Sequence, residues 1–122
     1  MVSQRGLEWE TIEYITANSE ILLYAWLDTI PSKSADKVNE DIARLELFGL
    51  RWGMPHVRKL DEHIWELRTK TGSDIYCVLM FRWHKTTLVL THGFTKKQNK
   101  TPPQEIVRAE RHRTDWINRK GV

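Results

Sequence analysis

The segment from Leu88 to Pro102 reads LVLTHGFTKKQNKTP, which combines a strand, a basic loop and the start of a helix. The apolar half predicts a strand ending near Phe94, and the following loop carries three lysines within five residues. Lysine side chains are rarely buried without a partner, so we expect this loop at the surface. Thr101 and Gln104 form a capping-box pattern, which predicts that a helix begins there. A fixed cluster of positive charge should therefore lie beside a sheet.

Hydrophobic periodicity in the remaining chain predicts an α+β fold with one domain over residues 1–122. The expected elements are an N-terminal strand over residues 7–15, a helical hairpin over 19–31 and 35–49, an antiparallel three-stranded meander over 59–71, 74–83 and 86–94, and a C-terminal helix over 101–120. We expect Ser19 to cap the first helix, Gly49 to end the second, and residues 50–58 to form an irregular crossover. The helices should cover one face of the sheet and leave the other partly open.

The composition is that of a globular protein, because 122 residues with 40% hydrophobic content can form one substantial core. The apolar runs are much shorter than the roughly 18 residues of a membrane-spanning helix, and residues 1–6 lack an apolar signal segment. We therefore expect a soluble, cytoplasmic protein. Cys77 is the single cysteine, and the five histidines lack the short spacings of metal ligands, so we expect neither a metal site nor another cofactor.

Charge is distributed unevenly along the chain, although the net charge is only +3. Residues 1–61 hold 7 Lys and Arg against 10 Asp and Glu, whereas residues 62–122 hold 12 against 6. A basic C-terminal half indicates a polyanionic partner such as nucleic acid, whose binding would weaken with salt. A solvated charged surface without such a partner is the alternative interpretation.

A strand meander should bring several basic residues together, namely Lys59, Arg68, Lys96, Lys97 and Lys100. In one groove they would hold successive phosphates, and a positioned cation would stabilise the extra negative charge on a phosphorane during RNA cleavage. Stacking surfaces or a proton-transfer group would come from Tyr76, His92, Trp65 and Trp83, although both tryptophans also fit a hydrophobic core.

Two of the polar positions have an alternative structural interpretation. His92 shares strand parity with Leu90 and Phe94, so it is either a buried, hydrogen-bonded histidine or a catalytic one. Glu66 and Arg68 share a strand face, so they either pair with each other or act separately. The sequence leaves both alternatives open.

Three motifs occur together in an order and spacing that is specific: LDEHIWELR at 60–68, DIY at 74–76, and LTHGFTKKQNKTP at 90–102. Because of these three motifs, the sequence from about Ala35 to Ala109 resembles the HigB-like, phage-derived branch of the RelE/ParE toxin superfamily. The resemblance implies a RelE-like fold and a toxin of a type II toxin–antitoxin pair that cleaves translated mRNA on the ribosome without metal. It also implies a cognate antitoxin, of acidic or helix-turn-helix type, as partner.

The resemblance also assigns positions, and it matches Lys59, Glu66, Arg68, His92, Lys96, Lys97 and Lys100 to the family pattern. The residues that we expect to be catalytic are Arg68, Lys96, Lys97 and His92. Those that we expect to bind RNA are Lys59, Tyr76, Arg82 and Lys100.

One position departs from the family pattern. Relatives usually carry arginine directly after the tyrosine of the middle strand, whereas this chain has Cys77 after Tyr76. Arg82 cannot take the same place, because a shift of five positions along a strand reverses the face. The departure keeps two further interpretations open: a ParE-like toxin that inhibits DNA gyrase, and a non-catalytic RNA-binding prophage protein.

Overall fold

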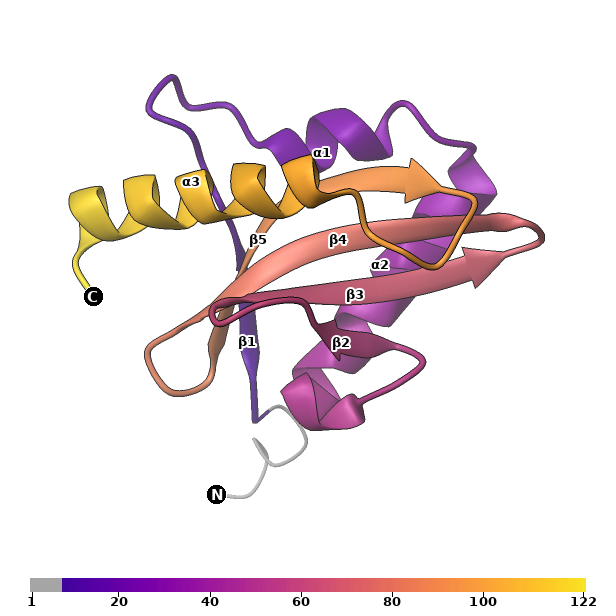
Figure 1. Ribbon diagram of the computed structural model, residues 1–122, viewed down its shortest axis with the longest axis horizontal. Coiled ribbons are helices and arrows are strands. Elements are labelled where there is room, and N and C mark those ends of the chain that lie inside the picture. Colours follow the sequence, from indigo (N-terminus) through magenta and orange to yellow (C-terminus); the bar gives the residue numbers. More distant parts are fainter. Residues whose placement is uncertain (1–7) are drawn as a thin grey trace.

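A mixed five-stranded sheet forms the centre of the computed structural model, which describes residues 8–122 (Figure 1). The strands are β1 (Glu10–Glu13), β2 (Val57–Lys59), β3 (Ile64–Thr71), β4 (Asp74–Trp83) and β5 (Thr87–Lys96), in the spatial order β1-β5-β4-β3-β2. β1 runs parallel to β5, and the other neighbours are antiparallel. The helices are α1 (Leu22–Leu27), α2 (Ser32–Phe48), the 3-10 helix η1 (Gly49–Trp52) and α3 (Pro103–Lys120).

The predicted α+β class is confirmed, as is the order of N-terminal strand, helical hairpin, meander and C-terminal helix. β2 is an addition that the pattern of residues 50–58 does not predict. The predicted first strand begins at Leu7, which lies outside the described residues, and β1 occupies only its middle part. Between residues 8 and 122, no helix combines the length and the apolar character needed to cross a membrane.

Helices cover both faces of the sheet, which corrects the expectation of one covered face. α1 and α2 pack on one face, and α3 crosses the opposite face (Figure 1). The reason lies in β4, where every residue from Ile75 to Phe81 is buried. A strand with buried side chains on both faces needs cover on both, unlike the alternating strand of a half-open sheet.

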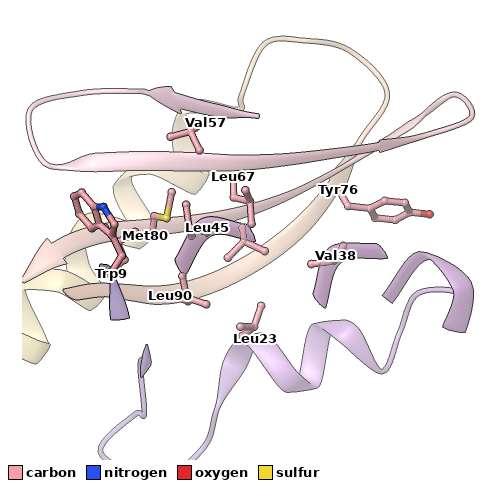
Figure 2. Packing of buried hydrophobic residues seen from close by; sticks show 11 residues of the cluster. Trp9, Leu23, Val38, Leu45, Val57, Leu67, Tyr76, Met80 and Leu90 are labelled. Atoms are coloured by element: carbon pink, nitrogen blue, oxygen red, sulfur yellow. The ribbon is translucent and has the colours of Figure 1, made fainter. Parts of the chain in front are cut away.

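Each face of the sheet has its own hydrophobic core. On the α1 and α2 side, Leu67, Met80 and Leu90 of the sheet meet Leu23 of α1 and Leu45 of α2 (Figure 2). On the other side the core consists of Tyr14, Ile64, Leu79, Phe81, Val89, Ala109 and Trp116. The apolar stripes of α2 and α3 therefore hold the sheet between them.

α2 ends where its last turn meets the indole of Trp9. Gly49 follows the helix with φ +62°, a conformation that favours glycine, and a Cβ at this position would collide with the Trp9 ring. The backbone N–H of Gly49 donates to Leu45 O and completes the helical hydrogen bonds. The predicted end of this helix is confirmed, and the same glycine gives Trp9 its place in the core.

The two predicted helix caps are wrong. Ser19 lies before α1 with a positive φ of 66°, and α1 begins at Leu22 without a side-chain cap. α3 begins at Pro103, also without one, because the hydroxyl of Thr101 donates to the carboxylate of Glu66 instead. The threonine that the sequence assigns to the helix therefore belongs to the polar part of the sheet.

A β-bulge in β5 decides on which side of the sheet His92 lies. Leu79 pairs with His92, and the next residue of β4 pairs with Leu90. Thr91 is therefore an extra residue between two paired positions. His92 faces α3 together with Phe94, whereas Leu90 faces α1 and α2. The predicted common parity of His92 and Leu90 is wrong for this reason.

Gly93→Ala should lower the free energy of unfolding by about 1–3 kcal/mol, because the added methyl group would overlap the Trp26 ring. Denaturant unfolding measures this loss. The same substitution in a Trp26→Leu background should be better tolerated, since the smaller side chain leaves room for the methyl group. An equal loss in both backgrounds would contradict the steric explanation.

Candidate functional site

Glu66 of β3 is completely buried and surrounded by three cationic side chains. Lys96 Nζ lies 3.2 Å from Glu66 Oε1, and the Thr101 hydroxyl donates to the same oxygen. Arg58 Nη2 and Arg68 Nε lie 3.2 Å and 3.4 Å from Oε2. A buried carboxylate requires such partners, because an unpaired charge in the interior is strongly disfavoured. These five residues are called the Glu66 cluster below.

Strand register brings the cluster together. Arg58 pairs with Glu66 across β2 and β3, and Arg68 follows two residues along β3 on the same face. Lys96 ends β5, and the loop after it folds back over β4 toward β3 (Figure 1). In that loop, Asn99 accepts hydrogen bonds of 2.8–2.9 Å from all three cations. The loop and the sheet therefore hold each other in place.

The Glu66 cluster carries surplus positive charge, because three cations share one carboxylate. Within residues 8–122, the Nε groups of Arg58 and Arg68 have no hydrogen-bond acceptor of good geometry. The Arg58 side chain is 29% exposed, whereas that of Lys96 is 4% exposed. An anion from solvent would therefore meet Arg58 first, whereas the unpartnered Nε atoms of both arginines are buried.

The structure brings together only part of the predicted basic group. Arg68 and Lys96 belong to the Glu66 cluster, and Lys100 is exposed in the adjoining loop. Lys97 is exposed as well, but it pairs with Asp74, and this hydrogen bond raises the pKa of the lysine. The loop thus presents two lysines to solvent, one of which already has a counter-charge.

Lys59, Tyr76 and Arg82 lie on the opposite face of the sheet. Lys59 Nζ lies 5.5 Å from the centre of the Trp65 ring. The Arg82 guanidinium lies 5.2 Å from the centre of the Trp9 ring. The Tyr76 ring is buried against α1. The thickness of the sheet therefore separates these three predicted RNA-binding residues from the Glu66 cluster.

Arg58 is the cation of the Glu66 cluster that the sequence-based prediction misses. It lies in the segment interpreted as an irregular crossover, and its strand has only three residues. The available signal is its position next to Lys59, because neighbouring residues of a strand face opposite sides. Once β2 pairs with β3, Arg58 faces Glu66 and Lys59 faces away.

His92 is buried between β5 and α3, with 1% of its surface exposed. Its Nε2 lies 2.9 Å from Glu105 Oε1, and its Nδ1 lies 3.1 Å from Thr91 Oγ1. The His112 ring of α3 stands edge-on to it at 5.4 Å. Burial lowers the pKa of His92 to about 3 and that of His112 to about 4, so both rings are neutral at pH 7. The catalytic role of His92 stays a prediction, for a side chain that solvent does not reach.

Cys77 occupies the position of the arginine that the family resemblance implies, opposite Arg68 in the pairing of β3 and β4. Its side chain is completely buried, and burial raises the pKa of the thiol to about 12. The thiol is therefore uncharged at neutral pH. Arg58 supplies a cation on the same face from the edge strand β2, which β3 separates from β4.

Glu66→Gln should lower the free energy of unfolding by about 3 kcal/mol or more, because it preserves the side-chain shape but removes the counter-charge of three cations. The matched control is Asp74→Asn, which removes a charge from the exposed pair with Lys97 and should change stability by less than about 1 kcal/mol. Urea unfolding of both variants measures the difference. Equal losses would contradict the structural role of Glu66.

Acid should destabilise the fold between about pH 6.5 and pH 4, where the unfolded chain binds protons that folded His92 and His112 do not. The stability contributed by the two neutral rings is complete above pH 6.5. It falls with decreasing pH by up to about 1.4 kcal/mol per unit for each such proton. In urea unfolding at several pH values, His92→Gln should flatten this slope, whereas His63→Gln, at a partly exposed position, should leave it unchanged. If His92→Gln keeps the wild-type slope of unfolding free energy against pH, groups other than His92 cause the acid sensitivity.

Comparison with known proteins identifies the family. A family model described as Phage derived protein Gp49-like (DUF891) matches residues 25–114. The matched segment contains α2, the strands β2 to β5 and every residue of the Glu66 cluster. No curated protein matches the sequence. Since the family model covers most of the chain, the protein belongs to the phage-derived Gp49-like family, a group within the RelE/ParE-like toxin superfamily.

Proposed function

We propose that this chain is the toxin of a type II toxin–antitoxin pair, of the HigB-like branch, and a ribosome-dependent endoribonuclease that cleaves translated mRNA without a metal ion. Membership of a toxin superfamily supports the first part. The observation that carries the second is the Glu66 cluster, where three cations share one carboxylate beside an exposed basic loop. A phosphate is the ligand that suits such surplus positive charge next to a partly exposed guanidinium.

The proposed cleavage needs mainly positioning and charge from the protein. The RNA 2′-oxygen attacks the adjacent phosphorus, so that a 2′-O–P bond forms and the bond to the 5′-oxygen of the next nucleotide breaks. The 2′-hydroxyl loses a proton and the departing 5′-oxygen gains one, which leaves a 2′,3′-cyclic phosphate and a 5′-hydroxyl. The guanidinium groups of Arg58 and Arg68 would stabilise the additional negative charge of the pentacoordinate species.

Burial divides the proposed roles of the basic residues. The side chains of Arg58 and Arg68 are 29% and 11% exposed, so we assign the phosphate contacts to them. Lys96 is 4% exposed and bonded within the cluster, so it positions the loop and the arginines. Lys97 and Lys100 are exposed in the loop and would add affinity for the RNA backbone.

The partner that we propose besides mRNA is a cognate antitoxin of acidic or helix-turn-helix type. An acidic segment lying over Arg58 and Lys100 would neutralise the basic surface and block the approach of mRNA. Such docking by charge should weaken as salt is raised. A copurified complex whose affinity is independent of salt would contradict it.

Arg58→Gln combined with Arg68→Gln should abolish growth arrest and lower mRNA cleavage by about 100-fold or more, as the loss of positioned donors does in other active sites. Primer extension soon after induction detects the cleaved 5′ ends. The matched control Arg51→Gln removes a 74% exposed arginine that pairs with Glu8 outside the cluster, and it should still cleave. Unfolding curves of the purified variants show whether the double variant has kept its fold.

The same experiment separates the alternatives. Cuts inside translated codons that vanish only in the double variant would support the nuclease. Growth arrest with intact mRNA and accumulating DNA breaks would indicate a ParE-like toxin acting on gyrase. Binding to programmed ribosomes without cleavage would indicate a non-catalytic RNA-binding protein. The neutral, buried thiol of Cys77 is the observation that favours these two alternatives.

A further inference from the structure

A groove of about 520 Å³ lies between α2 and the edge of β3, next to the Glu66 cluster. β2 pairs with β3 as far as Leu67, and the backbone N–H of Arg68 donates to His56 O at 2.8 Å, so it is the edge of β3 beyond Arg68 that borders the groove. α2 contributes Lys37 and Arg44, and β3 contributes Arg68 and Lys70. Arg68 also belongs to the Glu66 cluster, so the groove and the cluster share one residue.

The groove is strongly basic, because four of its residues are cationic and one is a carboxylate. The carboxylate of Asp41 is bonded to Arg44 at 2.9 Å and to the Thr69 hydroxyl at 2.7 Å, and the residue is 7% exposed. Lys37 and Lys70 are exposed, and within residues 8–122 neither forms a salt bridge. Two cations are thus available to an anionic ligand along the groove.

Aromatic rings line the groove beside these cations. Trp52 and His56 are stacked, with ring centres 4.2 Å apart and planes inclined by 16°. The ring centres of Phe48 and Trp52 lie 5.5 Å apart, and Phe48 is 45% exposed. Stacked rings next to unpaired cations suit the bases and phosphates of single-stranded nucleic acid. An acidic peptide would satisfy the lysines but would leave the planar surface without a planar partner.

We propose that this groove binds a segment of single-stranded RNA, with one base stacked on His56 and the backbone phosphates at Lys37 and Lys70. The proposal rests on the proposed function, because Arg68 would join the RNA in the groove to the phosphate that is cleaved. The groove would fix the position of the strand relative to Arg58 and Arg68. It would also make cleavage depend on the nucleotide that stacks on His56.

Lys37→Gln combined with Lys70→Gln should reduce the salt dependence of binding to a fluorescein-labelled 2′-O-methyl RNA. This RNA cannot be cleaved by the proposed reaction, because it has no free 2′-hydroxyl to attack the phosphate. Each lost phosphate contact lowers the slope of log K against log salt by about 0.7, so the slope should fall by about 1.4. The control pair, Lys33→Gln with Lys85→Gln, removes the same charge from exposed positions outside the groove and should keep the slope. Equal slopes for both pairs would overturn the proposal.

His56→Ala tests the stacking. It should weaken binding of the same RNA about five-fold or more, the effect of losing one base–aromatic contact. A strand with abasic sites in place of its bases should bind wild type and His56→Ala alike. An unchanged affinity of His56→Ala for the base-containing strand would overturn the assignment of His56.

These binding results are independent of the nuclease, since the assays contain no ribosome and no cleavable strand. Groove-dependent binding without mRNA cuts in cells would refute the proposed nuclease and keep the groove as an RNA site. Cleaved mRNA together with equal binding and equal cleavage by both lysine pairs would refute the groove and keep the nuclease.

Discussion

The charge of one buried carboxylate determines how the basic half of the molecule is arranged. Glu66 has no exposed surface, so its charge must be met by neighbouring donors. These come from β2, β3 and β5 and from the hydroxyl of Thr101 ahead of α3. The place of the edge strand, the path of the basic loop and the direction of two arginines therefore depend on the same interaction. Side chains fixed in this way lose less conformational freedom on binding than free lysines on a loop do.

Elements with a long and regular pattern could be predicted from the sequence. β4 is apolar along most of its length, and α2 combines a helical stripe with Gly49 at its end. β2 could not be predicted, because three residues contain too little pattern and their strand state depends on pairing with β3. Thr101 illustrates the opposite error: a clear local capping signal was overridden by a tertiary partner, the carboxylate of Glu66.

The candidate site was easier to predict in its residue types than in its arrangement. Arg68 and Lys96 lie together as the motifs indicate, whereas Lys59 lies across the sheet from them. A single extra residue, Thr91, places His92 beneath α3. Register and bulges decide the face of every strand residue, and they arise from pairing between distant segments. Local sequence therefore identifies the basic strands but not which of their side chains meet.

The parallel pairing of β1 with β5 has a consequence for the order in which the molecule is made. Residues 10–13 lie beside residues 87–90, so the first strand is synthesised long before its partner. Contacts between such distant segments form late in folding. Lys96 and Thr101 leave the ribosome later still, and without them Glu66 lacks part of its counter-charge. The nascent chain therefore cannot assemble its basic surface until residues 96–101 have been synthesised.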